Sequence, residues 1–139
     1  MKSFVSRAIS FFRPKEPTIP KNTFNLSLIS NYVFYITDSI NHNMIDNHIY
    51  EVYSVAIISK DSSISGYEII FWEVREDSTL FSVAKFQVSG SFATVSFGSS
   101  VIAEFNDMDS LESFLNALKD SEALRKRVNN HIVLMEHDK

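Results

Sequence analysis

The sequence predicts an α+β fold: an antiparallel β-meander of four to five strands packed by C-terminal helices, with an amphipathic helix at the N-terminus. Two observations support this prediction. Runs rich in β-branched and aromatic residues follow one another between residues 49 and 105, and a leucine-rich helical pattern then occupies residues 107–129. The turns between the runs are too short to hold crossover helices, so neighbouring strands must be antiparallel.

The strand prediction rests on four runs, which are residues 49–59, 66–75, 79–88 and 92–105. The last run is either one bent strand or two strands split at residues 98–100. Within the second run, Ile70 and Trp72 alternate with Phe71 and Glu73. This alternation predicts a sheet with one buried face and one partly wet face.

Two other segments have a strand-like composition. Residues 31–37 (NYVFYIT) are aromatic and β-branched and are predicted as a strand, followed by a polar loop or a short helix over residues 38–48. Residues 131–135 (HIVLM) are predicted as a final edge strand. Between them, residues 107–129 are predicted to be helical, with Asp107 or Asp109 as the N-cap and a break at residues 119–121, where Ser121 caps a second helix.

The N-terminus is expected to be an arm. Residues 1–13 place Phe4 and Phe12 on the apolar face of a helix and Arg7 on the opposite face. Residues 14–23 contain three prolines and are predicted as an extended connector, so the α+β domain is assigned to residues 24–139. A signal peptide is rejected because polar residues interrupt the apolar segment. The arm has three interpretations: it packs on the domain, contacts a membrane surface weakly, or docks in a groove of a partner.

Composition and charge narrow the functional classes. The 139 residues include no Cys and three widely spaced Gly, which excludes disulfides, zinc–thiolate sites and Gly-rich phosphate loops. The net charge of −4 divides into +4 over residues 1–21 and −8 over residues 22–139. An acidic domain argues against nucleic-acid binding and favours a basic protein partner. The absence of Cys fits a cytoplasmic location, with a membrane-peripheral one as the alternative.

No catalytic motif is found. The best candidate for acid–base or metal chemistry is the segment containing His42, Asp46 and His48, but its spacing matches no established ligand motif. The serines are not in nucleophile elbows and are explained by turns. The chain is therefore predicted not to be an enzyme and to need neither a cofactor nor a metal.

The candidate partner-binding residues are acids and aromatics on the predicted strands and in one turn. Acids that interrupt apolar strands beside aromatic side chains are typical of a recognition surface, because aromatics anchor interfaces and acids attract cationic partners. The residues are Glu51, Glu68, Glu73, Tyr53, Trp72, Glu76 and Asp77. The alternative interpretation is an ordinary solvated sheet face with charges that prevent aggregation.

These observations favour a non-catalytic protein that masks a basic protein partner, most concretely an immunity protein that neutralises a cognate toxin. An acidic secretion chaperone or adaptor that holds an extended client by strand addition is the first alternative. A peripheral membrane adaptor anchored by residues 1–13 is the second. The oligomeric state stays open.

Overall fold

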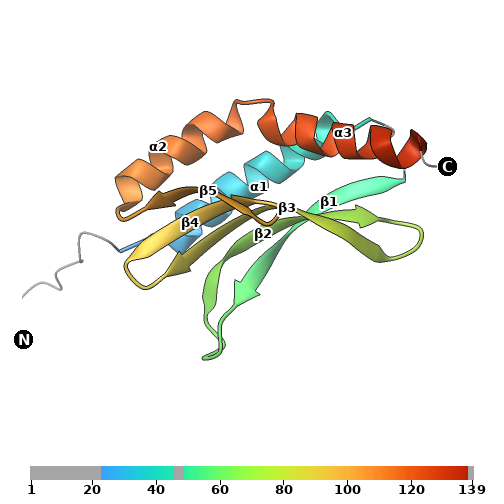
Figure 1. Cartoon of the computed structure of the whole chain (residues 1–139). Coiled ribbons are helices and arrows are strands. Elements are labelled where there is room, and N and C mark those ends of the chain that lie inside the picture. The colour runs from blue at the N-terminus through green and yellow to red at the C-terminus, as the bar shows by residue number, and fades with distance from the viewer. Residues whose placement is uncertain (1–22, 46–48, 138–139) are drawn as a thin grey trace, which may run out of the picture.

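The computed structural model describes residues 23–45 and 49–137, and it confirms the predicted fold class (Figure 1). The elements in chain order are α1 (Leu26–His42), β1 (Tyr50–Ile58), β2 (Ile64–Glu73), β3 (Ser78–Ser89), β4 (Phe92–Phe97), β5 (Ser100–Phe105), α2 (Met108–Lys119) and α3 (Ala123–His137). The predicted arm, residues 1–13, and all but the last residue of the connector lie outside the described residues. The N-terminal helix of the described fold is α1.

The five strands form one sheet in the order β1-β2-β3-β4-β5, with every neighbouring pair antiparallel. The run 92–105 is two strands, because the chain turns at Gly98 with a positive φ of 63° that favours glycine. The pairing register shifts twice between β2 and β3, at Ile69/Ile70 and at Phe71/Trp72. Such irregularities twist a sheet and re-aim the side chains that follow them.

The predicted strand at residues 31–37 is wrong, because these residues lie inside α1. Buried positions Ile29, Val33, Ile36 and Ile40 recur at helical spacing, and the Asn25 side chain caps the first turn by accepting from the N–H of Leu28. The burial of this stripe against the sheet overrides the β propensity of the individual residues. The segment 38–48 is likewise helical up to His42.

The predicted edge strand at residues 131–135 is also wrong. Leu124, Val128 and Ile132 are buried at four-residue intervals, so α3 continues through the apolar HIVLM segment to His137. The break at residues 119–121 is confirmed, since α2 ends at Lys119 and α3 begins at Ala123. Asp107 is the N-cap of α2, where its carboxylate accepts from the N–H of Ser110 at 2.8 Å.

All three helices pack on the same face of the sheet (Figure 1). The core between them and the sheet contains Tyr50, Val52, Ile69 and Phe71 from the strands, and helix residues such as Leu115. Among the described residues no element covers the other face of the sheet, which we call the open face. No helix in the described ranges is long and apolar enough to cross a membrane.

Candidate functional site

The open face holds a cluster of aromatic and acidic side chains on β1 and β2. In the strand register Glu51 lies opposite Trp72, and Tyr53 lies opposite Ile70. The Tyr53 and Trp72 rings meet edge to face, with centroids 5.7 Å apart and an interplanar angle of 90°. The Tyr53 hydroxyl donates a hydrogen bond to the Glu51 carboxylate. The contacts fix the orientation of two aromatic rings beside a carboxylate on an uncovered surface.

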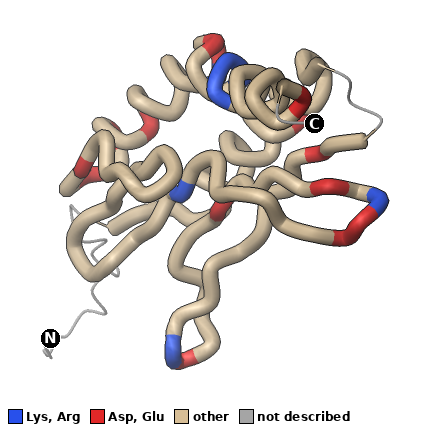
Figure 2. The backbone as a smooth tube through the Cα atoms, turned by 45° about the vertical axis from the view of Figure 1, so that its right-hand side comes forward, with Lys and Arg blue, Asp and Glu red and all other residues tan. Residues whose placement is uncertain are grey.

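The acidic turn between β2 and β3 joins this cluster electrostatically. The pKa of Tyr53 is raised above its usual value by the hydrogen bond to Glu51, then by burial and by the negative charges of Glu51 and Asp77. The negative charge of Asp77 is the smallest of these causes. Glu76 is exposed beside Asp77 in the same turn. Figure 2 marks the charged positions along the backbone, and in the sequence Arg75 directly precedes Glu76 and Asp77 in this turn.

We call Glu51, Tyr53, Trp72 and Asp77 the acidic–aromatic cluster. Glu68 shares the open face with it but lies farther along β2, opposite Val55 on one side and Lys85 on the other. The opposite charge of Lys85 partly balances Glu68. Glu68 therefore extends the surface without adding as much net negative charge as Glu51 and Asp77 do.

Glu73 does not belong to this surface. It pairs with Tyr50 in the register, shares the helix-covered face with Phe71 and is 8% exposed, so the expectation that it is an exposed strand residue is wrong. Strict alternation along β2 already directs the side chains of Glu73 and Trp72 to opposite faces of the sheet. Within the described residues its Oε1 atom has no hydrogen-bond partner. The candidate arm residues Phe4, Arg7 and Phe12 precede the described part of the chain.

The His42, Asp46 and His48 segment is only partly visible. His42 is exposed at the end of α1, whereas Asp46 and His48 are not among the described residues. In residues 23–45 and 49–137, no group of three or more His, Asp or Glu side chains is placed to hold a metal ion. The absence of enzymatic activity stays a prediction.

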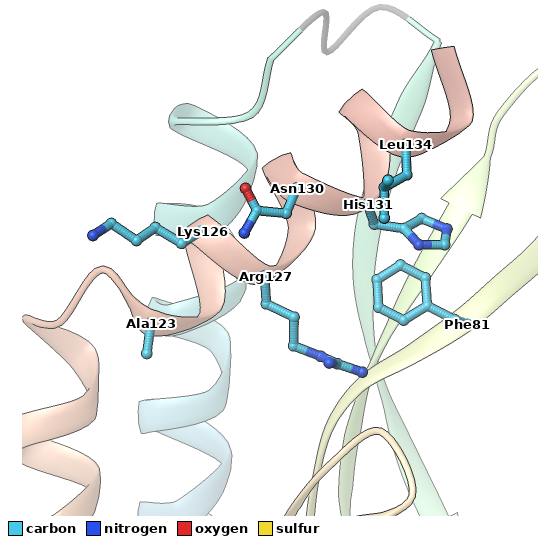
Figure 3. Close-up of a pocket in the computed structure, with 7 residues that line it drawn as sticks. All are labelled: Phe81, Ala123, Lys126, Arg127, Asn130, His131 and Leu134. Atoms are coloured by element: carbon cyan, nitrogen blue, oxygen red, sulfur yellow. The ribbon is translucent and has the colours of Figure 1, made fainter. Parts of the chain in front are cut away.

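The structure also contains a hollow that the sequence did not indicate (Figure 3). It has a volume of about 640 Å³ and lies between α3 and β3. Its lining residues are Phe81, Ala123, Lys126, Arg127, Asn130, His131 and Leu134. Phe81 and His131 stack with ring centroids 4.1 Å apart, although 50 positions separate them in the sequence, and no local pattern predicts such a contact.

Arg127 in this hollow has a structural role. The register of β2 against β3 skips Val83, and the Arg127 guanidinium donates to the carbonyls of Val83 and Ser82 at 3.2 and 3.3 Å. It also lies 5.3 Å from the centroid of the Phe81 ring. Burial, with a smaller contribution from the Arg127 charge, lowers the pKa of His131. Three of its lining residues, Phe81, Arg127 and His131, are therefore already engaged with the fold, and the hollow is a weaker candidate site than the acidic–aromatic cluster.

Comparisons with protein-family models, with curated proteins and with solved structures give no match to this chain.

Proposed function

We propose that this is a non-catalytic binding protein whose open sheet face masks a basic protein partner, and that its most concrete form is an immunity protein acting on a cognate toxin. The observation that supports this is the acidic–aromatic cluster. It holds two mutually packed aromatic rings and the Glu51 carboxylate on a sheet face that no described element covers, with Asp77 in the adjoining turn between β2 and β3.

The chemistry of the cluster suits a cationic surface. Rigid aromatic rings provide contact area with little loss of side-chain entropy, and they are frequent among the residues whose truncation costs about 2 kcal/mol or more of binding free energy. Carboxylates around them accelerate encounter with positively charged partners and pair with Lys or Arg on contact. Because the Glu51 carboxylate is already oriented by Tyr53, little ordering is needed on binding.

Trp72 provides a direct test, because it is the only tryptophan in the chain and belongs to the cluster. The full chain is used as bait in extracts of its source cells, and captured proteins are identified by mass spectrometry. Each purified candidate is then titrated against the chain while the emission of Trp72 is followed. We expect a basic protein that binds stoichiometrically and changes the Trp72 emission, with affinity that falls as salt is added.

The matched variants are the double variant Glu51→Gln/Asp77→Asn, which removes two charges from the cluster, and Glu122→Gln, which removes an exposed charge before α3. The double variant should bind the basic partner at least tenfold more weakly, about 1.4 kcal/mol. Glu122→Gln should bind as the unaltered chain does. Equal binding by all three proteins, or a partner that leaves Trp72 emission unchanged, would contradict the proposal.

A further inference from the structure

We propose that the outer edge of β1, over residues 54–58, pairs with the same edge of a second copy of this chain, antiparallel and centred on Ala56. β1 is the first strand of the sheet and has a strand neighbour on one side only. An edge strand carries a row of N–H and C=O groups directed away from its sheet, and these groups form a template for another strand. This interaction is independent of the function proposed for the open face.

The hydrogen bonds of β1 show which residues direct their backbone groups outward. The Asn41 side chain binds both outward groups of Val52: its amide donates to the Val52 carbonyl and its oxygen accepts from the Val52 N–H, both at 2.9 Å. The Ile49 carbonyl accepts from the N–H of Val74 at 3.0 Å, so the odd-numbered residues of β1 direct their backbone N–H and C=O groups toward β2. Because the direction alternates along a strand, Ser54 and Ala56 face the same outer edge as Val52.

The edge is protected at Val52 and open beyond it. Asn41 occupies the backbone groups of Val52 as a further strand would, but within the described residues no group bonds the outward N–H and C=O of Ser54 or Ala56. At this point the β1–β2 hairpin extends away from the helical layer (Figure 1). The pairing irregularity between Ile57 and Ile58 ends the regular part of the edge.

The side chains of this segment lack the usual protection against edge pairing. Residues 54–58 (SVAII) include no charge and no proline. Val55 is 39% exposed and Ile58 is 57% exposed. The unprotected segment is therefore apolar, exposed and able to form a ladder.

A second copy fits this segment because pairing centred on Ala56 sets only uncharged residues of 54–58 opposite one another. With Ala56 opposite Ala56 of the second copy, Val55 lies opposite Ile57 and Ser54 lies opposite Ile58, so no charge faces a charge. Val52 then falls opposite Lys60, which is in the turn beyond the strand, and the Asn41 contact is undisturbed.

The absence of Cys from the chain makes the register testable by cross-linking. In the proposed pair the two Ala56 Cα atoms are about 5.5 Å apart, within the range of a disulfide, whereas the two Ser54 Cα atoms are about 14 Å apart. Full-length Ala56→Cys and Ser54→Cys proteins are oxidised at equal concentration and followed by non-reducing electrophoresis. We expect Ala56→Cys to form the cross-linked dimer at least tenfold faster. Equal rates, or faster linkage through Ser54→Cys, would overturn the register.

Sedimentation equilibrium tests the association without a cross-link. The unaltered chain should show a monomer–dimer equilibrium, with weak affinity because a five-residue edge is small. Ala56→Lys places two like charges on the two-fold axis and should weaken dimerisation at least tenfold. The control is Val101→Lys, which puts the same charge at a 63% exposed position on β5, at the other edge of the sheet. A monomer at every concentration, or dimerisation weakened by Val101→Lys and not by Ala56→Lys, would refute the proposal. Circular dichroism confirms that both variants are folded.

Discussion

Arg127 stabilises an irregularity in the pairing of β2 and β3. Its removal should lower the free energy of unfolding even though the residue is not in the proposed binding surface. Its guanidinium satisfies the carbonyls of Val83 and Ser82 where β3 departs from the register of β2. It also packs over the Phe81 ring. The guanidinium has room beside these two carbonyls because Gly98, in the turn between β4 and β5, has no side chain. A Cβ on Gly98 would lie 2.5 Å from the guanidinium.

The expected magnitude follows from these contacts. Hydrogen bonds to charged groups contribute about 1.5–3 kcal/mol each, and a cation–π contact contributes about 0.5–1 kcal/mol. The side chain is half-buried, so water replaces part of what is lost. We therefore expect Arg127→Ala to lower the free energy of unfolding by about 2–4 kcal/mol, which for a chain of this size lowers Tm by roughly 6–16 °C.

Chemical denaturation and calorimetry measure this change, with Lys126→Ala as the control because Lys126 is the exposed neighbour of Arg127 on α3. The control should change stability by less than about 0.5 kcal/mol. In Arg127→Ala the midpoint of the His131 titration, followed by NMR, should also rise, since the Arg127 charge contributes to lowering that pKa. A loss of stability no larger than that of the control, with no change at His131, would show that Arg127 does not stabilise the irregularity.

Three further predictions concern titration. Asp61 should titrate by NMR with a pKa of about 2, because the Ser63 and Ser59 hydroxyls and the Ser63 N–H hydrogen-bond its carboxylate; Ser63→Ala should raise that midpoint, and an unchanged one would contradict the assignment. The pKa of His131 is lower in the folded chain than in the unfolded chain, so as pH falls the unfolded chain protonates this histidine first. The contribution of neutral His131 to stability is therefore complete above about pH 6.5 and is lost progressively below it. Unfolding free energies measured from pH 7.5 to 5 should decline, and a rise would refute the sign. Tyr53 should ionise at higher pH than a free tyrosine, and Glu51→Gln should lower its pKa, as ultraviolet absorbance at alkaline pH will show; no change on substitution would remove Glu51 as the cause.

The strands were predictable from the sequence because β-branched runs and polar turns coincide along residues 49–105. The α1 helix was not, because the aromatic and β-branched residues around Tyr35 favour a strand locally and only the buried stripe through Val33 and Ile36 determines the helix. That stripe stabilises a helix only when the sheet is present to bury it. Composition alone was therefore decisive for the meander and misleading for the helix.

The acidic–aromatic cluster was only partly predictable. Its residue types were evident, but which of them share a face depends on the register, and two pairing shifts between β2 and β3 lie beside the cluster. Alternation alone separates Glu73 from Trp72, yet it does not show that the charge of Asp77 acts on Tyr53. The hollow between α3 and β3 depends on contacts between residues about 50 positions apart, for which a single sequence holds no signal.

The two proposed surfaces have a joint consequence that neither has alone. A two-fold axis perpendicular to the sheet relates the antiparallel β1 edges, so the open faces of both copies lie on the same side of one continuous sheet. Two acidic–aromatic clusters would then face a common direction, and a basic partner that is itself dimeric, or that is held on a surface, would engage both. Ala56→Lys should weaken binding to such a bivalent target and leave binding to the same partner as a free monomer unchanged. Surface-immobilised and solution titrations of one partner distinguish the two cases: equal loss in both would mean that Ala56 lies in the partner interface itself and not at a contact between copies.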